Sequence, residues 1–235
     1  MREKRSGRVG KWLLDLLFPP KCAFCGRLLS EGEKDVCTGC TAALPRNGRQ
    51  PRKLDFVTGA TAPFFYEGQV RQAMLRYKFN GAPARGQVFG RLIAEDLRER
   101  ELADFDLVTW VPLSARRLHR RGYDQAELLA RAAAETLGLE AVPLLKKIRH
   151  NRTQSGIAAA EARRANVSGC YSAADPARAA GKRILLIDDI ITTGATVCEC
   201  ARMLMLAGAD SVRAASLAIR RRENNKLEPH EVTDI

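Results

Sequence analysis

A short, uninterrupted run of apolar residues lies in the C-terminal third of the chain. Ile184–Ile187 lacks the alternation that is typical of a strand with one face in solvent. It therefore predicts a strand of a parallel sheet that is buried on both faces. We expect the strand to end at Asp188, because the adjacent carboxylates Asp188 and Asp189 are costly to bury without partners. They would then lie at the carboxyl end of the sheet, where open α/β sheets bind ligands.

The rest of the pattern alternates between strand-like and helix-like segments, which predicts an α/β fold. Strands are predicted at 60–66, 106–112, 142–145 and 211–219, with one more ending near Tyr171, and helices at 69–77, 86–101, 126–137, 158–165 and 197–207. A short amphipathic helix at 11–18 would either pack on the neighbouring domain or lie on a membrane surface. Because no apolar run approaches about 20 residues, we expect no membrane span.

The residues after the two carboxylates are small and rich in hydroxyl groups. They are Thr192, Thr193, Gly194, Ala195 and Thr196. Their backbone N–H groups could surround a phosphate at the N-terminus of the next helix, with Gly194 permitting close approach. The adjacent carboxylates would repel a plain phosphate, so we expect a ligand that also offers hydroxyl groups or a bound metal, such as a sugar phosphate. The alternative is an ordinary turn between strand and helix.

Four of the seven cysteines form two Cys-x-x-Cys pairs near the N-terminus, Cys22/Cys25 and Cys37/Cys40. Two such pairs can bring four thiolates to one tetrahedral zinc ion. A redox role is the alternative, although a redox Cys-x-x-Cys normally stands alone at a helix start. The zinc would be structural, because so short a segment has too small a core to fold without metal. The other cysteines are scattered, which is typical of a reducing cytoplasm.

The chain carries a formal net charge of +12, which would attract either nucleic acid or a polyphosphate substrate. Four arginines fall between Ser114 and Arg121, after a predicted strand end. They form either a solvated face or an anion site, and Arg116 and Arg117 suit phosphate because guanidinium forks pair with its oxygens. The basic stretch Lys146–Gly156 is either a mobile lid or a plain surface loop.

The segment from the apolar strand through Thr196 resembles the type I phosphoribosyltransferases, whose hallmark is an apolar strand, paired acids and a Thr-Thr-Gly loop. The resemblance implies that Thr192–Thr196 holds the 5-phosphate of phosphoribosyl pyrophosphate (PRPP). It also implies that Asp188 and Asp189 are catalytic and hold the ribose hydroxyls. Ser114–Arg117 would bind the pyrophosphate together with Mg²⁺, and Lys146–Gly156 would form a flexible hood.

The chain from about Leu13 to Arg220 also resembles the competence protein ComF family, which joins a four-cysteine zinc module to a phosphoribosyltransferase-like domain. Besides the cysteines and the loop, the resemblance is carried by Tyr77-Lys78, Val111-Pro112-Leu113, Arg121-Gly122-Tyr123-Asp124-Gln125, Gln154 and Arg163-x-x-Asn166-Val167. Tyr123-Asp124 stands where the family usually has Phe-Asn, and Asn151 stands where Thr is common.

The expected organisation has five segments: a basic N-terminus with a short helix (1–18), a zinc ribbon (19–45), a basic linker (46–55), the phosphoribosyltransferase-like domain (56–220) and a polar tail (221–235). Two functional hypotheses follow from the resemblance. The first is a phosphoribosyltransferase that uses PRPP and Mg²⁺ on an unidentified acceptor. The second is a competence factor that binds single-stranded DNA and proteins of the DNA-uptake machinery.

Overall fold

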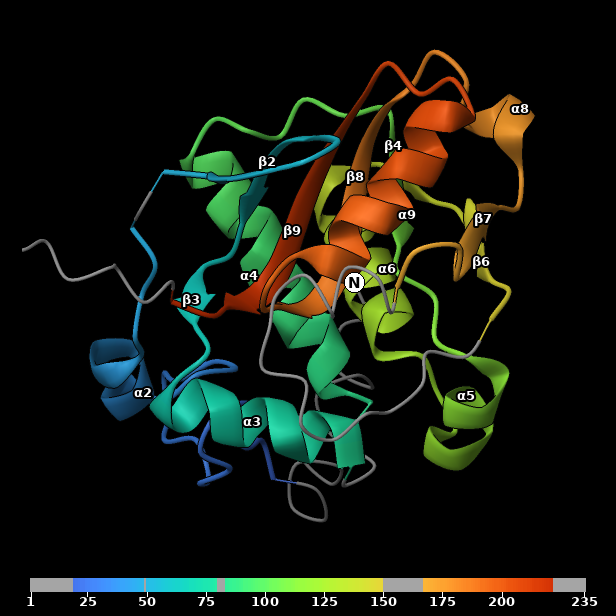
Figure 1. The fold of residues 1–235 in the computed structure, drawn as a ribbon. Helices are drawn as coiled ribbons and strands as arrows, with labels where there is room; N and C mark the ends of the chain where they lie inside the picture. The colour runs from blue at the N-terminus through green and yellow to red at the C-terminus, as the bar shows by residue number, and fades with distance from the viewer. Residues whose placement is uncertain (1–18, 49, 80–82, 150–166, 222–235) are drawn as a thin grey trace, which may run out of the picture.

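The computed structural model describes residues 19–48, 50–79, 83–149 and 167–221. The predicted helices at 11–18 and 158–165, most of the proposed hood and nearly all of the polar tail lie outside these residues. Within the described part of the chain, no helix has the length and apolar character needed to cross a bilayer. The described residues form an α/β domain with the cysteine-containing segment packed at its side (Figure 1).

A seven-stranded sheet forms the centre of the domain, with the order β1-β2-β9-β8-β4-β5 and β3 paired to β9. All of its pairs are parallel except β1 with β2. The strands are β1 (Arg52–Leu54), β2 (Val57–Thr61), β3 (Phe64–Phe65), β4 (Leu107–Trp110), β5 (Glu140–Ala141), β8 (Arg183–Ile191) and β9 (Ser211–Ile219). β6 (Leu145–Lys147) and β7 (Tyr171–Ala173) form a separate antiparallel pair.

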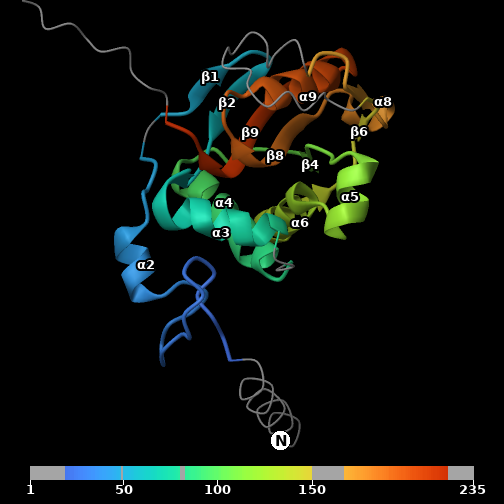
Figure 2. The same ribbon diagram turned by 60° about the horizontal axis from the view of Figure 1, so that its bottom comes forward.

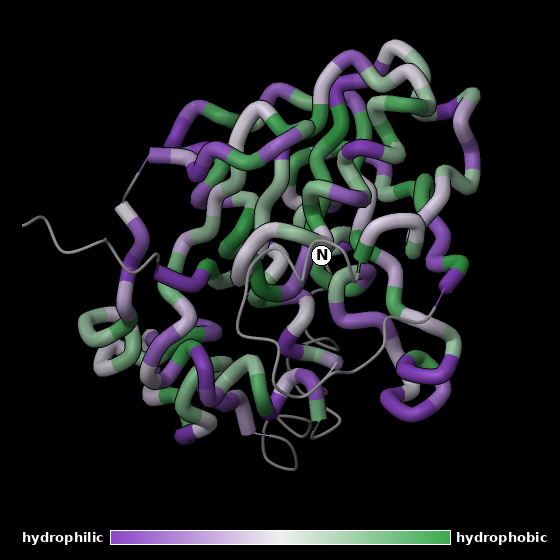
Figure 3. The backbone as a smooth tube through the Cα atoms, in the orientation of Figure 1, coloured by the Kyte–Doolittle hydropathy of each residue, from purple (hydrophilic) through white to green (hydrophobic). Residues whose placement is uncertain are grey.

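Helices cover both faces of the sheet (Figure 2). They are α3 (Gly68–Phe79), α4 (Arg85–Glu99) and α6 (Gln125–Leu137) on one face and α9 (Ala195–Leu206) on the other, with α2 (Thr38–Ala43), α5 (Ala115–Arg121) and α8 (Pro176–Ala179) outside these layers. Leu185 and Ile187 of β8 belong to the core under α3, α4 and α6, whereas Ile184 and Leu186 belong to the core under α9. This confirms a strand buried on both faces, and the central strands are accordingly hydrophobic along the tube in Figure 3.

Several predicted elements differ in detail from the observed ones. In place of the predicted strand at 60–66 the structure has two strands, β2 and β3. In place of the predicted strand at 142–145 it has β5, which ends at Ala141, and β6, which begins at Leu145. The stretch expected to be a linker contains β1, which pairs with β2. The arginine-rich stretch, for which no helix was predicted, forms helix α5, since its residues favour helix and Gly122 ends it in the left-handed conformation, with φ 78°.

The cysteine-containing segment shares a hydrophobic core with the α/β domain. Phe24 is fully buried, and its ring centroid lies 5.3 Å from those of both Phe64 and Phe89. Polar contacts reinforce this packing: Arg91 of α4 pairs with Asp35, and the Arg76 guanidinium of α3 donates to the Phe24 carbonyl. The segment therefore docks firmly on α3 and α4.

Candidate functional site

β8 extends beyond the end of its neighbour β4, and the two carboxylates lie in this extension. The last register pair between the strands is Trp110 with Ile187, whereas β8 stays paired with β9 as far as Ile191. The expectation that the strand ends at Asp188 is therefore wrong. Because β4 ends before β8, no strand lies beside Asp188 and Asp189 on that side of β8. Their backbone stays in the strand, where its strand partner is β9.

The two carboxylates have different partners. Asp188 accepts a hydrogen bond from the Asp189 backbone N–H at 2.7 Å, and Asp189 forms an ion pair with the Lys78 ammonium at 2.8 Å. Removal from water raises the pKa of Asp188 above the usual aspartate range, and the negative charge of Asp189 raises it further. Asp188 is thus a strong acceptor that lacks a cation of its own among the described contacts.

A cavity of about 210 Å³ opens beside these carboxylates. It is bounded by the residues that follow β4, the start of α6, the end of α3, and the β6–β7 pair. Its lining residues are Lys78, Val111, Pro112, Leu113, Arg117, Arg121, Asp124, Gln125, Ala126, Lys147, Tyr171, Asp188, Asp189, Ile190 and Thr196. Four cations and three carboxylates thus surround one space, which suits a ligand with both anionic and hydroxyl groups.

Two of the cavity's cations are available for an anion. Lys147 donates to the Tyr171 hydroxyl at 3.0 Å, and within the described residues neither Lys147 nor Arg117 forms an ion pair with a carboxylate. Burial lowers the pKa of Lys147, and the nearby Arg117 guanidinium lowers it further. Both groups would gain from a bound phosphate or pyrophosphate, which would relieve their mutual repulsion.

Asp124 has a structural role at the edge of the cavity. It caps α6 by accepting from the Ala126 N–H at 3.0 Å and also accepts from the Leu113 N–H at 2.8 Å. This second bond ties the residues after β4 to the start of α6. Asp124 thereby shapes the cavity wall rather than offering a free carboxylate.

The loop between β8 and α9 is braced by β1. Gly194 has a φ of 88°, and a Cβ atom added there would lie 2.6 Å from Leu54 Cδ1. The Arg52 guanidinium donates to the Thr192 carbonyl at 2.8 Å and also contacts the Arg220 carbonyl. Glycine is therefore required here for its backbone conformation and for packing against β1. Ala195 and Thr196, expected to precede the helix, instead form its first turn.

The structure brings together only part of the predicted binding set. Asp188, Asp189, Arg117 and Thr196 line the cavity, while Thr192, Thr193, Gly194 and Ala195 form the adjacent loop and helix start. Ser114 is buried at the start of α5, and Arg116 is exposed on that helix; neither lines the cavity. Lys147 belongs to the predicted hood, and Lys78 to the Tyr77-Lys78 pair that carries the family resemblance, but neither was assigned to the binding set. Tyr171 was missed, because nothing in its local sequence marks it as a neighbour of β8.

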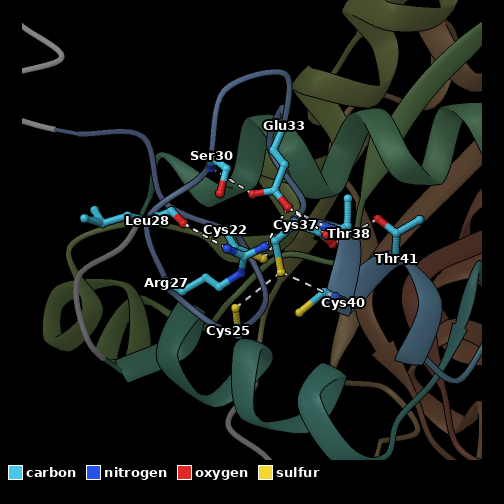
Figure 4. A network of polar contacts seen from close by, with 10 residues as sticks. All are labelled: Cys22, Cys25, Arg27, Leu28, Ser30, Glu33, Cys37, Thr38, Cys40 and Thr41. Carbon is cyan, nitrogen blue, oxygen red and sulfur yellow. Dashed lines mark hydrogen bonds and ion pairs between the residues drawn. The ribbon is translucent and has the colours of Figure 1, made fainter.

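The four paired cysteines converge on one point at the N-terminal side of the domain (Figure 4). Their sulfur atoms all lie within 4.8 Å of one another, and Cys25 and Cys37 are 3.7 Å apart. Sulfurs at about 2.3 Å from a tetrahedral zinc ion would be about 3.8 Å apart, so the set fits zinc. Cys37 also caps α2, where its sulfur accepts from the Cys40 N–H at 3.4 Å.

Hydrogen bonds around the cysteines hold the turns that present them. Glu33 accepts from the backbone N–H groups of Ser30 and Thr38, each at 2.8 Å, and from Arg27 at 2.6 Å. These bonds lower the pKa of Glu33 to about 2, so its carboxylate stays ionised. Four sulfur ligands leave no open position on zinc, so this centre can hold structure but cannot bind a substrate.

The fold and both sites define a phosphoribosyltransferase-type domain combined with a zinc ribbon. A family model described as "Phosphoribosyl transferase domain" matches residues 120–234, and one described as "Double zinc ribbon domain" matches residues 13–52. The chain thus combines a phosphoribosyltransferase-type domain with a double zinc ribbon, and its named relatives are competence and DNA utilization proteins of the ComF type.

Relatives of known name agree with this assignment. Competence protein ComFC of Streptococcus pneumoniae is 28% identical over 228 residues, covering 84% of this chain and 99% of that protein. Competence protein F of Haemophilus influenzae is 30% identical and covers 61% of this chain and 65% of its own length. DNA utilization protein YhgH of Escherichia coli K12 is 31% identical over 109 residues, or 46% of this chain and 47% of that protein.

Solved structures with a similar arrangement include the glutamine phosphoribosylpyrophosphate amidotransferase of B. subtilis, in complex with ADP and GMP. It superposes with a TM-score of 0.42 at 23% sequence identity. The match covers 60% of this chain and 30% of that larger enzyme.

Proposed function

We propose that the protein binds PRPP in the cavity beside β8 and transfers its phosphoribosyl group to an acceptor. The observation that carries the proposal is the extension of β8 beyond β4. Its two carboxylates line the same cavity as Thr196 at the start of α9 and the cations Arg117 and Lys147. A ribose that carries a phosphate and a diphosphate offers hydroxyl groups to the carboxylates and anionic groups to the cations and the helix N-terminus.

Each part of the site has a separate role in this proposal. The loop from Thr192 to Thr196, at the N-terminus of α9, would hold the 5-phosphate. Asp188 and Asp189 would accept hydrogen bonds from the ribose hydroxyls and stabilise positive charge on the sugar. Arg117, with Lys147 beside it, would bind the diphosphate, which enters together with Mg²⁺ as part of the substrate.

The reaction would exchange one bond at the anomeric carbon. The bond from that carbon to the diphosphate oxygen breaks, the electron pair leaves with pyrophosphate, and the acceptor atom forms the new bond while losing a proton. Cations at the diphosphate stabilise the departing charge, and the carboxylates stabilise the developing cation on the ribose. The acceptor remains to be identified by experiment.

Calorimetry with Mg²⁺ and PRPP tests the proposal directly. Replacing both carboxylates, Asp188→Asn with Asp189→Asn, should lower affinity at least about a hundredfold, because two charge-assisted hydrogen bonds are lost. The variant should keep its circular dichroism spectrum and zinc content. Incubation with a panel of bases and amines, followed by pyrophosphate release, then identifies the acceptor. Equal PRPP affinity of the variant and the native protein would refute the assignment of the site.

A second candidate function, binding of single-stranded DNA, is supported by α5 and by the names of the relatives. Four arginines lie on α5, none of its residues is buried, and it borders the cavity through Arg117 and Arg121. Neutralising Arg116 and Arg120 together should weaken binding of an oligonucleotide and reduce its salt dependence by about two counter-ions. If the protein binds no oligonucleotide at low salt, this second function is excluded.

A further inference from the structure

Lys78 links the end of α3 to the carboxylates of β8. Its ammonium lies 2.8 Å from Asp189 Oδ2, and the two side chains are only 19% and 16% exposed. The ion pair therefore sits mostly away from bulk water, where attraction is stronger than on the surface. It neutralises one of two adjacent negative charges and fixes the direction in which that carboxylate points.

The position of Lys78 depends on contacts outside its own helix. It lies in the last turn of α3, where backbone carbonyl groups lack partners within the helix. The preceding residue, Tyr77, is fully buried, and its hydroxyl donates to the Gln125 carbonyl at 2.9 Å. The Tyr123 hydroxyl in turn donates to the Tyr77 carbonyl, so this turn is held on the side facing α6.

The other side of the same turn is held by the zinc ribbon. Arg76 donates from its guanidinium to the carbonyl of Phe24, which lies between Cys22 and Cys25. The Phe24 ring packs on Phe89, and the Tyr77 ring meets the same Phe89 edge to face at a centroid distance of 5.6 Å. Three consecutive residues, Arg76 to Lys78, thus contact the ribbon, the core and the cavity in turn.

We propose that the docked zinc ribbon positions Lys78 against Asp189 and thereby sets the geometry of the cavity's carboxylates. Lys78 is a positioning residue in this scheme, because it acts on a ligand through Asp189. The effect of this positioning on ligand binding rests on the proposed function. The placement of Lys78 by the ribbon is a property of the free protein and can be measured without any ligand.

The ligand-free test measures how fast an amine reagent acylates Lys78 in the full-length, zinc-loaded protein, with peptide quantification by mass spectrometry. In the native protein the ion pair should protect Lys78 relative to the exposed Lys182. Arg76→Ala should raise the Lys78 rate about fivefold, the factor expected for loss of one positioning hydrogen bond. Arg71→Ala, an exposed residue on the same helix, is the matched control and should leave the rate unchanged.

Zinc per chain and the circular dichroism spectrum establish that each variant is folded. If Arg76→Ala loses zinc, Arg76→Lys is a milder change at the same hydrogen bond, and Phe24→Leu keeps the carbonyl acceptor but alters the ring packing on Phe89. Arg76→Lys keeps a donor and should restore part of the protection. An unchanged Lys78 rate in all folded variants of this contact would overturn the inference.

The second arm measures PRPP affinity in a double-mutant cycle. Lys78→Ala should weaken binding about tenfold, Lys78→Arg should recover part of the loss, and Arg76→Ala should weaken binding less. In the Lys78→Ala background, Arg76→Ala should cause little further loss. Additive losses would show that the ribbon does not act through Lys78.

The two arms separate this inference from the proposed function. If the native protein binds no PRPP while Arg76→Ala still exposes Lys78 to acylation, the proposed function fails and the positioning of Lys78 by the ribbon stands. If the native protein binds PRPP but the rate of Lys78 acylation does not change when the ribbon contact is removed, the proposed function stands and the positioning of Lys78 by the ribbon fails.

Discussion

The zinc ribbon and the cavity beside β8 both gather charged or ionisable side chains, but they do so in opposite ways. The ribbon draws four sulfurs from residues 22–40, close to one another in the chain, around a single point. The cavity draws its groups from α3, β6, β7, β8, α9 and the residues around α5 and α6. The ribbon is complete with its own ligands, whereas the cavity leaves cations and a carboxylate in need of partners.

This difference distinguishes a metal centre that stabilises the fold from a cavity that is suited to bind a ligand. A zinc ion with four protein ligands has no vacant coordination position. The free energy of zinc binding therefore stabilises the folded ribbon. The cavity keeps Asp188 beside Asp189 and Lys147 beside Arg117, like charges that repel until a ligand arrives. Such groups reduce stability in the free protein and favour binding.

The largest expected effect is on the ribbon. Cys37→Ser should remove zinc and destabilise the protein by more than about 4 kcal/mol, because metal loss also loosens the core that Phe24 shares with α3 and α4. Zinc per chain and the midpoint of urea unfolding provide the measurements. Cys198→Ser, a partly buried cysteine of α9, is the matched control and should keep the zinc. Full zinc content in Cys37→Ser would show that the four sulfurs are not the ligand set.

A second change acts on the loop at the start of α9. Gly194→Ala places a Cβ atom against Leu54 and forces alanine into a left-handed conformation that costs about 1–2 kcal/mol. Affinity for ribose 5-phosphate should fall at least about tenfold, measured by calorimetry. Adding Leu54→Ala relieves the clash and should restore part of the affinity. No change in either variant would remove the loop from the phosphate site.

A smaller effect is expected from the brace that β1 supplies to this loop. Arg52→Ala removes the donor to the Thr192 carbonyl, so affinity for ribose 5-phosphate should fall by about threefold to tenfold. Zinc content should not change, because β1 packs through Leu54 on the core under α9, whereas the cysteines belong to the core on the other face of the sheet. Lys53→Ala, the exposed neighbour in β1, serves as the comparison. Equal affinities of the two variants would show that β1 does not support the loop.

The smallest expected effect is that of Asp188→Asn, which should increase stability while it decreases affinity for PRPP. Because the pKa of Asp188 is raised in the folded protein, this group binds more protons folded than unfolded. Its contribution to stability therefore falls as the pH rises above about 4, the unfolded value. Asp188→Asn should remove this loss and stabilise the protein at pH 8 by on the order of 1 kcal/mol.

The measurement for Asp188→Asn is the melting temperature at pH 5.5 and pH 8. Its advantage over the native protein should grow with pH, while PRPP affinity falls at both values. Asp189→Asn gives the contrast, since it breaks the ion pair with Lys78 and should not stabilise. A native protein more stable than Asp188→Asn at pH 8 would contradict the raised pKa.

Local patterns predicted the parts of this molecule that depend on neighbouring residues. The spacing of the cysteines, the apolar run of β8 and the helix that ends at Gly138 were all evident in the sequence. β9 was predicted with its observed bounds, Ser211–Ile219, which lie between Gly208-Ala209-Asp210 and a run of arginines.

Features that depend on distant residues were not predictable in the same way. The end of β8 is set by β9 on one side and by the early end of β4 on the other, so the carboxylates lie within the strand. Lys78 reaches the cavity from α3, which is distant from β8 along the chain, and Lys147 reaches it from the separate β6–β7 pair. Helix α5 was not predicted, because none of its residues is buried and its sequence therefore lacks the apolar stripe by which a helix is recognised.

The order of strands in the sheet has a consequence for the synthesis of the protein. Among the strands of the described residues, β9 is synthesised last, yet it lies between β2 and β8 and also pairs with β3. β2 and β3 therefore lack their sheet partner until residues 211–219 have left the ribosome, and Phe24 of the ribbon lacks its contact with Phe89 until α4 has been synthesised. Pairing between strands that are distant in the sequence slows folding, and apolar segments stay exposed until the sheet has formed. Nascent chains that stop before residue 211 should accordingly remain clients of chaperones.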